Sequence, residues 1–197
     1  LRRRALYGGA IFLFERRKTV ATWTYADGEA KRKDFMVFWI TDGSTTNITK
    51  DKLEIIGKGV EDMPISMNPE TEESQDVLGN NNYDITGYAE SMTVDPTNVS
   101  GESKYAQKID TLMEERATLS DLRLKYLCVK RYKTDSTGKM RAWVQEGVVE
   151  LGDFAGGLKG VSAAHTVHYV GDRTLGAVDP TTMAFTADGA SPASLSE

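Results

Sequence analysis

Short runs in which apolar and polar residues alternate recur along the chain and predict β-strands. The clearest run is 122–133, where Leu122, Leu124, Tyr126 and Cys128 share one face. Further runs of β-forming residues span 12–25, 31–40, 53–56, 140–151, 161–170 and 174–178. Asp27–Gly28 predicts a hairpin between the first two of these runs, and 134–138 predicts another hairpin loop. Turns are predicted at the glycine-rich stretch 152–160 and at 171–172.

The segment 83–94 carries a pattern of its own. Tyr83 and Ile85 alternate with polar residues, and beyond Gly87 the apolar phase shifts to Tyr88, Met92 and Val94. An alternation that changes face at a glycine predicts one strand with a β-bulge. Because a bulge bends its strand, we expect this strand to form part of the wall of a barrel. The acidic stretch 60–76 before it has few periodic apolar positions and is predicted to be a long loop or an irregular extended arm.

One segment has helical periodicity. Tyr105, Ile109, Leu112 and Met113 form an apolar stripe at helical spacing, and Ser103 is placed to cap the first turn. We therefore predict an α-helix over about 104–119 with one face packed on a sheet.

These elements predict a mainly β protein, namely an antiparallel β-sandwich or half-barrel with one flanking α-helix and extended loops and arms. The 197 residues suffice for one domain with a buried core. We divide the chain into a basic N-terminal arm over 1–19, a β domain over 20–179 and a flexible C-terminal tail over 180–197. The tail is low in bulky residues, which is typical of a segment without a core.

Charge is distributed unevenly along the chain. Residues 1–34 hold nine Lys/Arg against four Asp/Glu, whereas residues 54–102 hold eleven Asp/Glu against one cation, Lys58. If these segments lie at opposite ends of the folded unit, copies of the chain attract each other head to tail, which is a heterologous mode of assembly. The alternative is that both segments are solvated faces without a role in association.

The candidates for metal or nucleophile chemistry are few. The single cysteine, Cys128, lies in an alternating strand and is predicted to be a packed side chain, not a nucleophile. His165 and His168 are three residues apart on a predicted strand, so they face opposite sides and do not share a metal ion. We expect both histidines at the surface or at an interface.

Other motifs are absent or better explained by solvation. The acidic run near residue 70 lacks the spacing of a calcium-binding loop, and no serine-nucleophile or phosphate-loop motif occurs. No apolar run of about 18 residues is present, so no membrane-spanning helix is expected. The acidic chain carries no recognition motif for stable nucleic-acid binding. We predict no enzymatic activity, no cofactor and no metal site, and we interpret the N-terminal segment as a mobile arm or a trimmed leader.

A resemblance to a known family is carried by residues 53–132. An Asn-Pro-Glu-Thr segment at 68–71 leads to Leu-Gly-Asn at 78–80 and then to Ile-Thr-Gly-Tyr-Ala at 85–89, followed by the predicted helix around 109–112 and the strand at 126–132. This arrangement resembles the major tail proteins, or tail tube proteins, of long-tailed (siphovirus-like) bacteriophages. The arginine-rich N-terminus departs from the family pattern.

The resemblance implies a structural virion protein whose copies form hexameric rings that stack into a tail tube, the conduit for genome delivery. It further implies tape measure, tail terminator and tip proteins as partners, passage of DNA through the lumen without stable binding, and no membrane contact. The location implied is the virion, with assembly in the cytoplasm of the bacterial host.

The charge pattern and the resemblance together indicate which residues form contacts between subunits or rings. These are Arg16, Arg17, Lys18, Glu61, Asp62, Glu70, Glu72, Glu73 and Asp76. Two other interpretations stay open at this point. One is the inner tube of a contractile tail or of a type VI-like secretion system, and the other is a monomeric β-sandwich binding module or carbohydrate-active enzyme.

Overall fold

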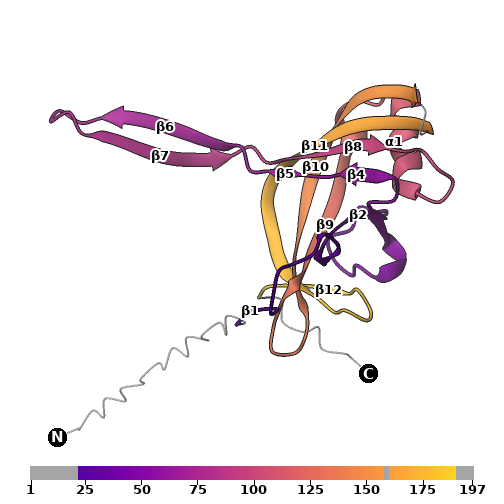
Figure 1. Ribbon diagram of the computed structural model, residues 1–197, viewed down its shortest axis with the longest axis horizontal. Coiled ribbons are helices and arrows are strands. Elements are labelled where there is room, and N and C mark those ends of the chain that lie inside the picture. Colours follow the sequence, from indigo (N-terminus) through magenta and orange to yellow (C-terminus); the bar gives the residue numbers. More distant parts are fainter. Residues whose placement is uncertain (1–21, 158–159, 190–197) are drawn as a thin grey trace, which may run out of the picture.

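A computed structural model describes residues 22–157 and 160–189, which fold into a curled antiparallel sheet with one α-helix packed on it (Figure 1). This architecture confirms the predicted mainly β half-barrel with a flanking helix. A long two-stranded arm projects from the body.

The described residues contain twelve strands and one α-helix. The strands are β1 (Thr24–Tyr25), β2 (Phe35–Ile40), β3 (Leu53–Ile56), β4 (Val60–Asp62), β5 (Ile65–Ser66), β6 (Pro69–Gln75), β7 (Asn81–Tyr88), β8 (Ser91–Thr97), β9 (Arg123–Thr134), β10 (Met140–Gly157), β11 (Gly160–Val178) and β12 (Phe185–Ala187). The helices are α1 (Lys104–Glu114) and the short 3-10 turns η1 (Arg32–Asp34), η2 (Lys50–Lys52) and η3 (Leu119–Leu122).

The main sheet has the strand order β3-β2-β9-β10-β11-β8-β4. Strand β1 is added to β9, β12 to β11 and β5 to β8, whereas β6 and β7 form a separate two-stranded sheet. All pairings between the described strands are antiparallel. Strands β3 and β4 therefore form the open edges of the main sheet.

Three consecutive long strands, β9, β10 and β11, form the centre of the sheet. The loop between β9 and β10 is the predicted hairpin loop, closed by Asp135, whose Oδ1 accepts hydrogen bonds from the backbone N–H groups of Thr137 at 2.8 Å and Lys139 at 3.0 Å. The turn predicted at 152–160 is mostly strand, because the ladder continues through the pairs Phe154–Ala163 and Ala155–Ser162.

The predicted turn at Gly171–Asp172 is also wrong, since β11 runs through it. Here the register with β10 shifts between the pairs Val144–Thr174 and Glu146–Val170, so that one residue of β10 opposes three of β11. The chain thus forms a bulge, which bends a strand without ending it.

Both faces of the sheet bury apolar side chains. On one face α1 covers the sheet with Tyr105, Ile109 and Leu112, each at most 1% exposed. The opposite face buries a second cluster that includes Ile40 and Leu127. The nearly continuous apolar run of β2 is explained by this arrangement, because its side chains alternate between the two clusters.

Helix α1 starts as predicted and ends earlier. The Ser103 hydroxyl accepts a hydrogen bond from the N–H of Ala106 at 3.2 Å, which is the expected N-cap. The helix ends at Glu114 and not near residue 119. Arg116 takes a left-handed conformation with φ of 50°, and the N–H of Ala117 bonds back to the carbonyl of Leu112, which closes the last turn.

The hairpin predicted around Asp27–Gly28 does not form among the described residues. Strand β1 pairs with β9, whereas β2 pairs with β3 and β9. The apolar residues of β2 can be buried on both faces only in the interior of the sheet, so the tertiary structure separates it from β1.

Two predictions for 60–94 are corrected. The stretch 60–76 is neither a loop nor irregular, because it contains β4, β5 and β6, although β6 does belong to an extended arm. The segment 83–94 is not one strand, because β7 ends at Tyr88 and β8 begins at Ser91. Only β8 enters the main sheet, where it pairs with β11, so β7 is not part of a barrel wall.

The terminal assignments have different outcomes. The basic arm predicted over 1–19 lies outside the described residues, as does the predicted start of the β domain at residue 20. The flexible tail predicted from residue 180 is corrected in part, because Phe185–Ala187 form β12 and pair with Gly176–Val178 of β11.

Candidate assembly surface

The arm consists of β6, the tip turn 76–80 and β7. Asp76 organises the tip: its Oδ1 accepts hydrogen bonds from the N–H groups of Leu78 at 2.8 Å and Asn80 at 2.9 Å, and its Oδ2 accepts one from the Asn80 side chain at 2.8 Å. These hydrogen bonds lower the pKa of Asp76, the bonds from Asn80 most strongly. Gly79, with φ of 85°, supplies the left-handed residue that the turn requires.

A bulge in β7 sets which side chains share a face of the arm. Thr71 pairs with Ile85, but the next pair is Glu70 with Gly87, so Thr86 is the extra residue. The predicted bulge is therefore present. Paired residues project to the same face, so the bulge brings Tyr88 back to the face that carries Tyr83 and Ile85.

That face is open to solvent and carries these three apolar side chains together with Thr71 and Glu73. Tyr83, Ile85 and Tyr88 are 62%, 52% and 56% exposed, and Val77 and Leu78 at the tip are exposed even more fully. Exposed apolar groups gathered on one element mark interaction surfaces. The arm thus presents an apolar stripe that its own chain does not cover in the part of the structure that is described.

The opposite face of the arm is acidic. Glu70, Glu72 and Asp84 lie on it, and Glu72 stands directly opposite Asp84. Like charges directly opposite each other destabilise a strand pair. No ion pair involves any of these acids within the described part of the chain. The arm therefore gains nothing electrostatically from its own fold.

Beyond its root, the arm is supported among the described residues only by its own ladder. Figure 1 shows it extending away from the body, and β6 and β7 hydrogen-bond only to each other. An isolated two-stranded sheet is marginally stable in water, and its outer edges offer unpaired backbone groups. These features together favour association with another molecule.

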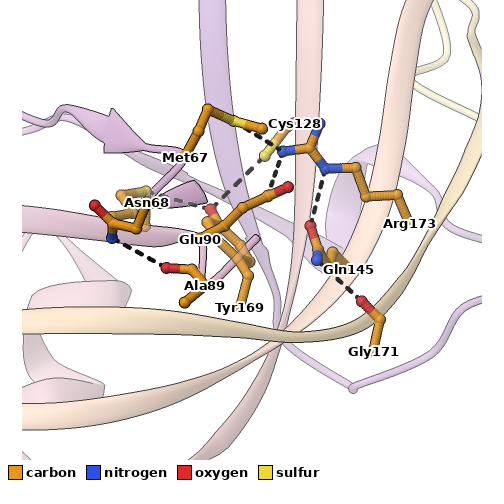
Figure 2. A network of polar contacts seen from close by, with 10 residues as sticks. Met67, Asn68, Ala89, Glu90, Cys128, Gln145, Tyr169, Gly171 and Arg173 are labelled. Carbon is orange, nitrogen blue, oxygen red and sulfur yellow. Dashed lines mark hydrogen bonds and ion pairs between the residues drawn. The ribbon is translucent and has the colours of Figure 1, made fainter. Parts of the chain in front are cut away.

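The root of the arm is held by a network of polar contacts around Arg173 (Figure 2). Arg173 lies in the bulge of β11, and its guanidinium forms an ion pair with Glu90 and donates to Gln145 Oε1 at 3.3 Å. The same guanidinium lies 4.0 Å from the sulfur of Met67 and 4.7 Å from the ring centroid of Trp143. Met67 lies just before β6 and Glu90 lies just after β7. The guanidinium of Arg173 therefore holds both strands of the arm to the sheet at its root.

Asn68 reinforces this root. Its side-chain amide donates to the carbonyl of Ala89 and to the hydroxyl of Ser91, both at 3.0 Å. Asn68 adopts φ of 41°, a conformation that asparagine tolerates better than most residues. The arm therefore leaves the body in a defined direction.

The acids predicted from the sequence to form contacts between subunits fall into two groups. Glu70, Glu72, Glu73 and Asp76 lie on the arm, although the carboxylate of Asp76 is engaged in the tip turn. Glu61 and Asp62 lie on β4, in the body. Arg16, Arg17 and Lys18 lie outside the described residues.

Sequence reasoning did not find the apolar face of the arm or the Arg173 network. Tyr83 and Ile85 were interpreted as barrel residues, because alternation reveals that a strand has an apolar face but not what covers it. Arg173 and Glu90 are 83 positions apart, and no local signal links them.

His165 and Cys128 belong to the packing of the body, whereas His168 lies at the surface. His165 is 3% exposed, so its predicted surface position is wrong; its Nε2 accepts from the Tyr105 hydroxyl at 2.7 Å, and its Nδ1 donates to the carbonyl of Ala163. Burial lowers the pKa of His165 and raises the pKa of Cys128 to about 12. His168 is exposed and contacts Glu150.

Neither a metal site nor a membrane-spanning helix is found among the described residues. Among them no group of three or more His, Cys, Asp or Glu side chains is arranged to hold a metal ion. No helix in the same ranges has the length and apolar character to cross a membrane.

Comparison with known proteins gives little beyond this geometry. No protein-family model and no curated protein matches the sequence. Among solved structures, the chain is similar to one from the cryo-EM structure of the anti-feeding prophage baseplate, symmetrised sixfold, with 12% identity and a TM-score of 0.42 over 75% of this chain and 95% of the other. A likeness this distant carries no information about function.

Proposed function

We propose that this protein is a structural subunit of a phage tail, which assembles with copies of itself into stacked, hexameric rings that form the tail tube. The observation that carries the proposal is the arm, whose apolar face is exposed and whose direction is fixed at the root by Arg173. An element with these properties serves to reach a neighbouring subunit. The sequence resemblance over 53–132 supplies the identity of the assembly.

The body supports the same role. Its curled sheet ends in two short edge strands, β3 and β4, which can pair with edges of neighbouring copies. Closure of such sheets into a ring removes their open edges and encloses a lumen. In this proposal DNA passes through that lumen, and tape measure, terminator and tip proteins contact the ends of the tube.

The proposal assigns no enzymatic activity to the protein. The buried His165 and Cys128 face other side chains of the body, and the extended arm serves contact between molecules. An inner tube of a contractile tail is the second form of the same function, and a sheath layer around the tube in micrographs distinguishes it.

Negative-stain microscopy and light scattering of the purified full chain test the proposal. We expect rings or tubes for the native sequence. Reversal of three arm charges, Glu70→Lys with Glu72→Lys and Glu73→Lys, should prevent stacking or shorten the tubes. A native chain that stays monomeric at high concentration contradicts the proposal, and tubes of normal length from the triple variant remove the arm acids from the contact.

A further inference from the structure

A groove lies beside the β3 edge of the body, between η1, the start of β2, and the β3–β4 turn. Its volume is about 630 Å³, and its apolar wall includes Phe35, Met36, Ile55 and Met63. Ile55 is 38% exposed, which is high for a residue in the middle of an apolar strand. The groove therefore offers apolar surface that no described segment of the chain covers.

The rim of this groove is strongly basic. Arg32, Lys33, Lys58 and Arg131 line it, against one acid, Asp62. All four cations are exposed, and none forms an ion pair with another described residue. We call this feature the basic-rimmed groove.

The groove continues into a second depression along the same strands. A neighbouring depression of about 480 Å³ shares Met36, Ile55, Lys58 and Arg131 with it and continues along the outer face of β2 and β3 to Phe38 and Leu53. A strand of seven residues, such as β6, spans about 23 Å at the usual rise. The two depressions together follow two strands of the sheet.

The arm is complementary to this groove in both polarity and charge. It carries the apolar stripe of Tyr83, Ile85 and Tyr88, and the sequence from Gly59 to Ser103 contains no Lys or Arg. Glu73 lies on the same face as the stripe and forms no ion pair with another described residue, so it matches the unpaired cations on the rim. Complementary potentials of this kind steer association and fix its register.

The other segments of this chain fit the groove less well. Residues 1–20 contain six Lys/Arg and one acid, so they are repelled by a basic rim. The arm of the same molecule points away from the body, as Figure 1 shows. The arm of a second molecule is not repelled by the basic rim, and its orientation relative to the groove is not fixed by the fold of the first molecule.

We propose that the basic-rimmed groove is the receptor for the β6–β7 arm of a second copy of this chain. The inference rests on the proposed function, for which it supplies the partner surface. Because the arm and the groove are different surfaces, the contact is heterologous, and repetition of it closes a ring or extends a filament.

Crosslinking between two variants that each carry one added cysteine tests the contact directly. One full-length variant carries Ser74→Cys on the exposed face of β6, and the other carries Lys33→Cys at the groove rim. The native Cys128 is fully buried and its pKa is raised to about 12, so it does not compete for a maleimide crosslinker. We expect a crosslinked heterodimer from the mixture, and none when Ser136→Cys in the exposed β9–β10 loop replaces the groove cysteine.

Charge reversal gives a second readout. The groove variant Arg32→Glu, Lys58→Glu, Arg131→Glu and the arm variant Glu70→Lys, Glu72→Lys, Glu73→Lys should each raise the concentration needed for association by about tenfold. An equimolar mixture of the two should recover association, since every arm then meets a groove of opposite charge. Reversal of Lys104, Lys108 and Arg116, on and just after α1, is the matched control and should have no effect.

The outcomes separate the inference from the proposed function. Rings or tubes without the arm–groove crosslink, or without recovery in the mixture, overturn the inference and leave the tube intact. The crosslink in particles that are neither rings nor tubes supports the inference and contradicts the tube.

Discussion

The arm and the β10–β11 hairpin are both antiparallel two-strand units, but they obtain their stability from different sources. The β10–β11 hairpin is flanked by β9 and β8 and buries side chains such as Val149 and Val167 on the sheet. The arm has no flanking strand, and its tyrosines face water. The same local geometry therefore serves as a core in one region and as a surface for association in the other.

Substitutions in the two regions are therefore expected to change different properties of the protein. Side chains buried within the body should change the free energy of unfolding of the single chain. Side chains on the arm should change association and leave the unfolding of the single chain nearly unaffected.

The largest effect is expected in the core under α1. Leu112→Ala removes a side chain that is 1% exposed, and it should lower the free energy of unfolding by about 2–5 kcal/mol because it leaves a cavity. Urea titration of the monomeric protein measures this change. Val77→Ala at the fully exposed arm tip is the control, with an expected change within about 0.5 kcal/mol. Equal losses at both positions would contradict the division between core and arm.

Substitutions at the root of the arm are expected to have an intermediate effect on the free energy of unfolding. Arg173→Gln leaves the Glu90 carboxylate, whose side chain is 11% exposed, without its cation, and should lower the free energy of unfolding by about 1–3 kcal/mol. The double variant with Glu90→Gln should recover part of this loss, which a double-mutant cycle measures. Arg141→Gln breaks a pair with the half-exposed Asp188 and should cost at most about 1 kcal/mol. If Arg173→Gln lowered the free energy of unfolding as little as Arg141→Gln does, the network around Arg173 would not hold the arm.

The buried histidine predicts a dependence on pH. Burial lowers the pKa of His165, so the unfolded chain binds a proton at a higher pH than the folded chain does. The stability from neutral His165 is complete above the unfolded pKa of about 6.5 and is lost as the pH falls from there towards the lower folded pKa, at up to about 1.4 kcal/mol per pH unit. Urea titrations at pH 7.5 and 5.5 should show a smaller difference for His165→Gln than for the native chain. His168→Gln, at an exposed position, should behave as the native chain does.

The smallest effect on unfolding is expected for the apolar face of the arm. Tyr83→Ser with Ile85→Ser removes exposed side chains, so the free energy of unfolding of the monomer should change by no more than about 0.5 kcal/mol. Association measured by light scattering should nevertheless be lost. A variant that assembles normally would show that this face does not contact a partner.

The sequence allowed much of the body to be predicted. The alternation of β9 and β10, the Asp135 loop between them and the Ser103 cap of α1 all follow from local rules, and the structure has them. The end of α1 was missed, because it depends on Arg116 adopting a left-handed conformation that no residue type there signals. The hairpin at Asp27–Gly28 was wrong because the burial of β2 on both faces outweighs a favourable turn sequence.

The candidate site was predicted only in part. The acids of β6 were identified from charge, but their placement on a projecting arm depends on β6 pairing with β7 and on β8 leaving for the main sheet. The basic-rimmed groove combines residues of η1, the β3–β4 turn and β9, which are distant in the chain. Such clusters form only when non-local strand pairing brings them together.

By itself the sequence determined the fold class, the single helix, the bulge near Gly87 and the acidic character of the stretch that contains β6, because period, turn chemistry and charge are local properties. The tertiary structure decided that Tyr83, Ile85 and Tyr88 face water and that Arg173 fastens the arm. Alternation shows that a strand has two faces, but burial depends on which other strands pack there. That choice is made by long-range pairing, and in the arm the pairing leaves an apolar face for another molecule.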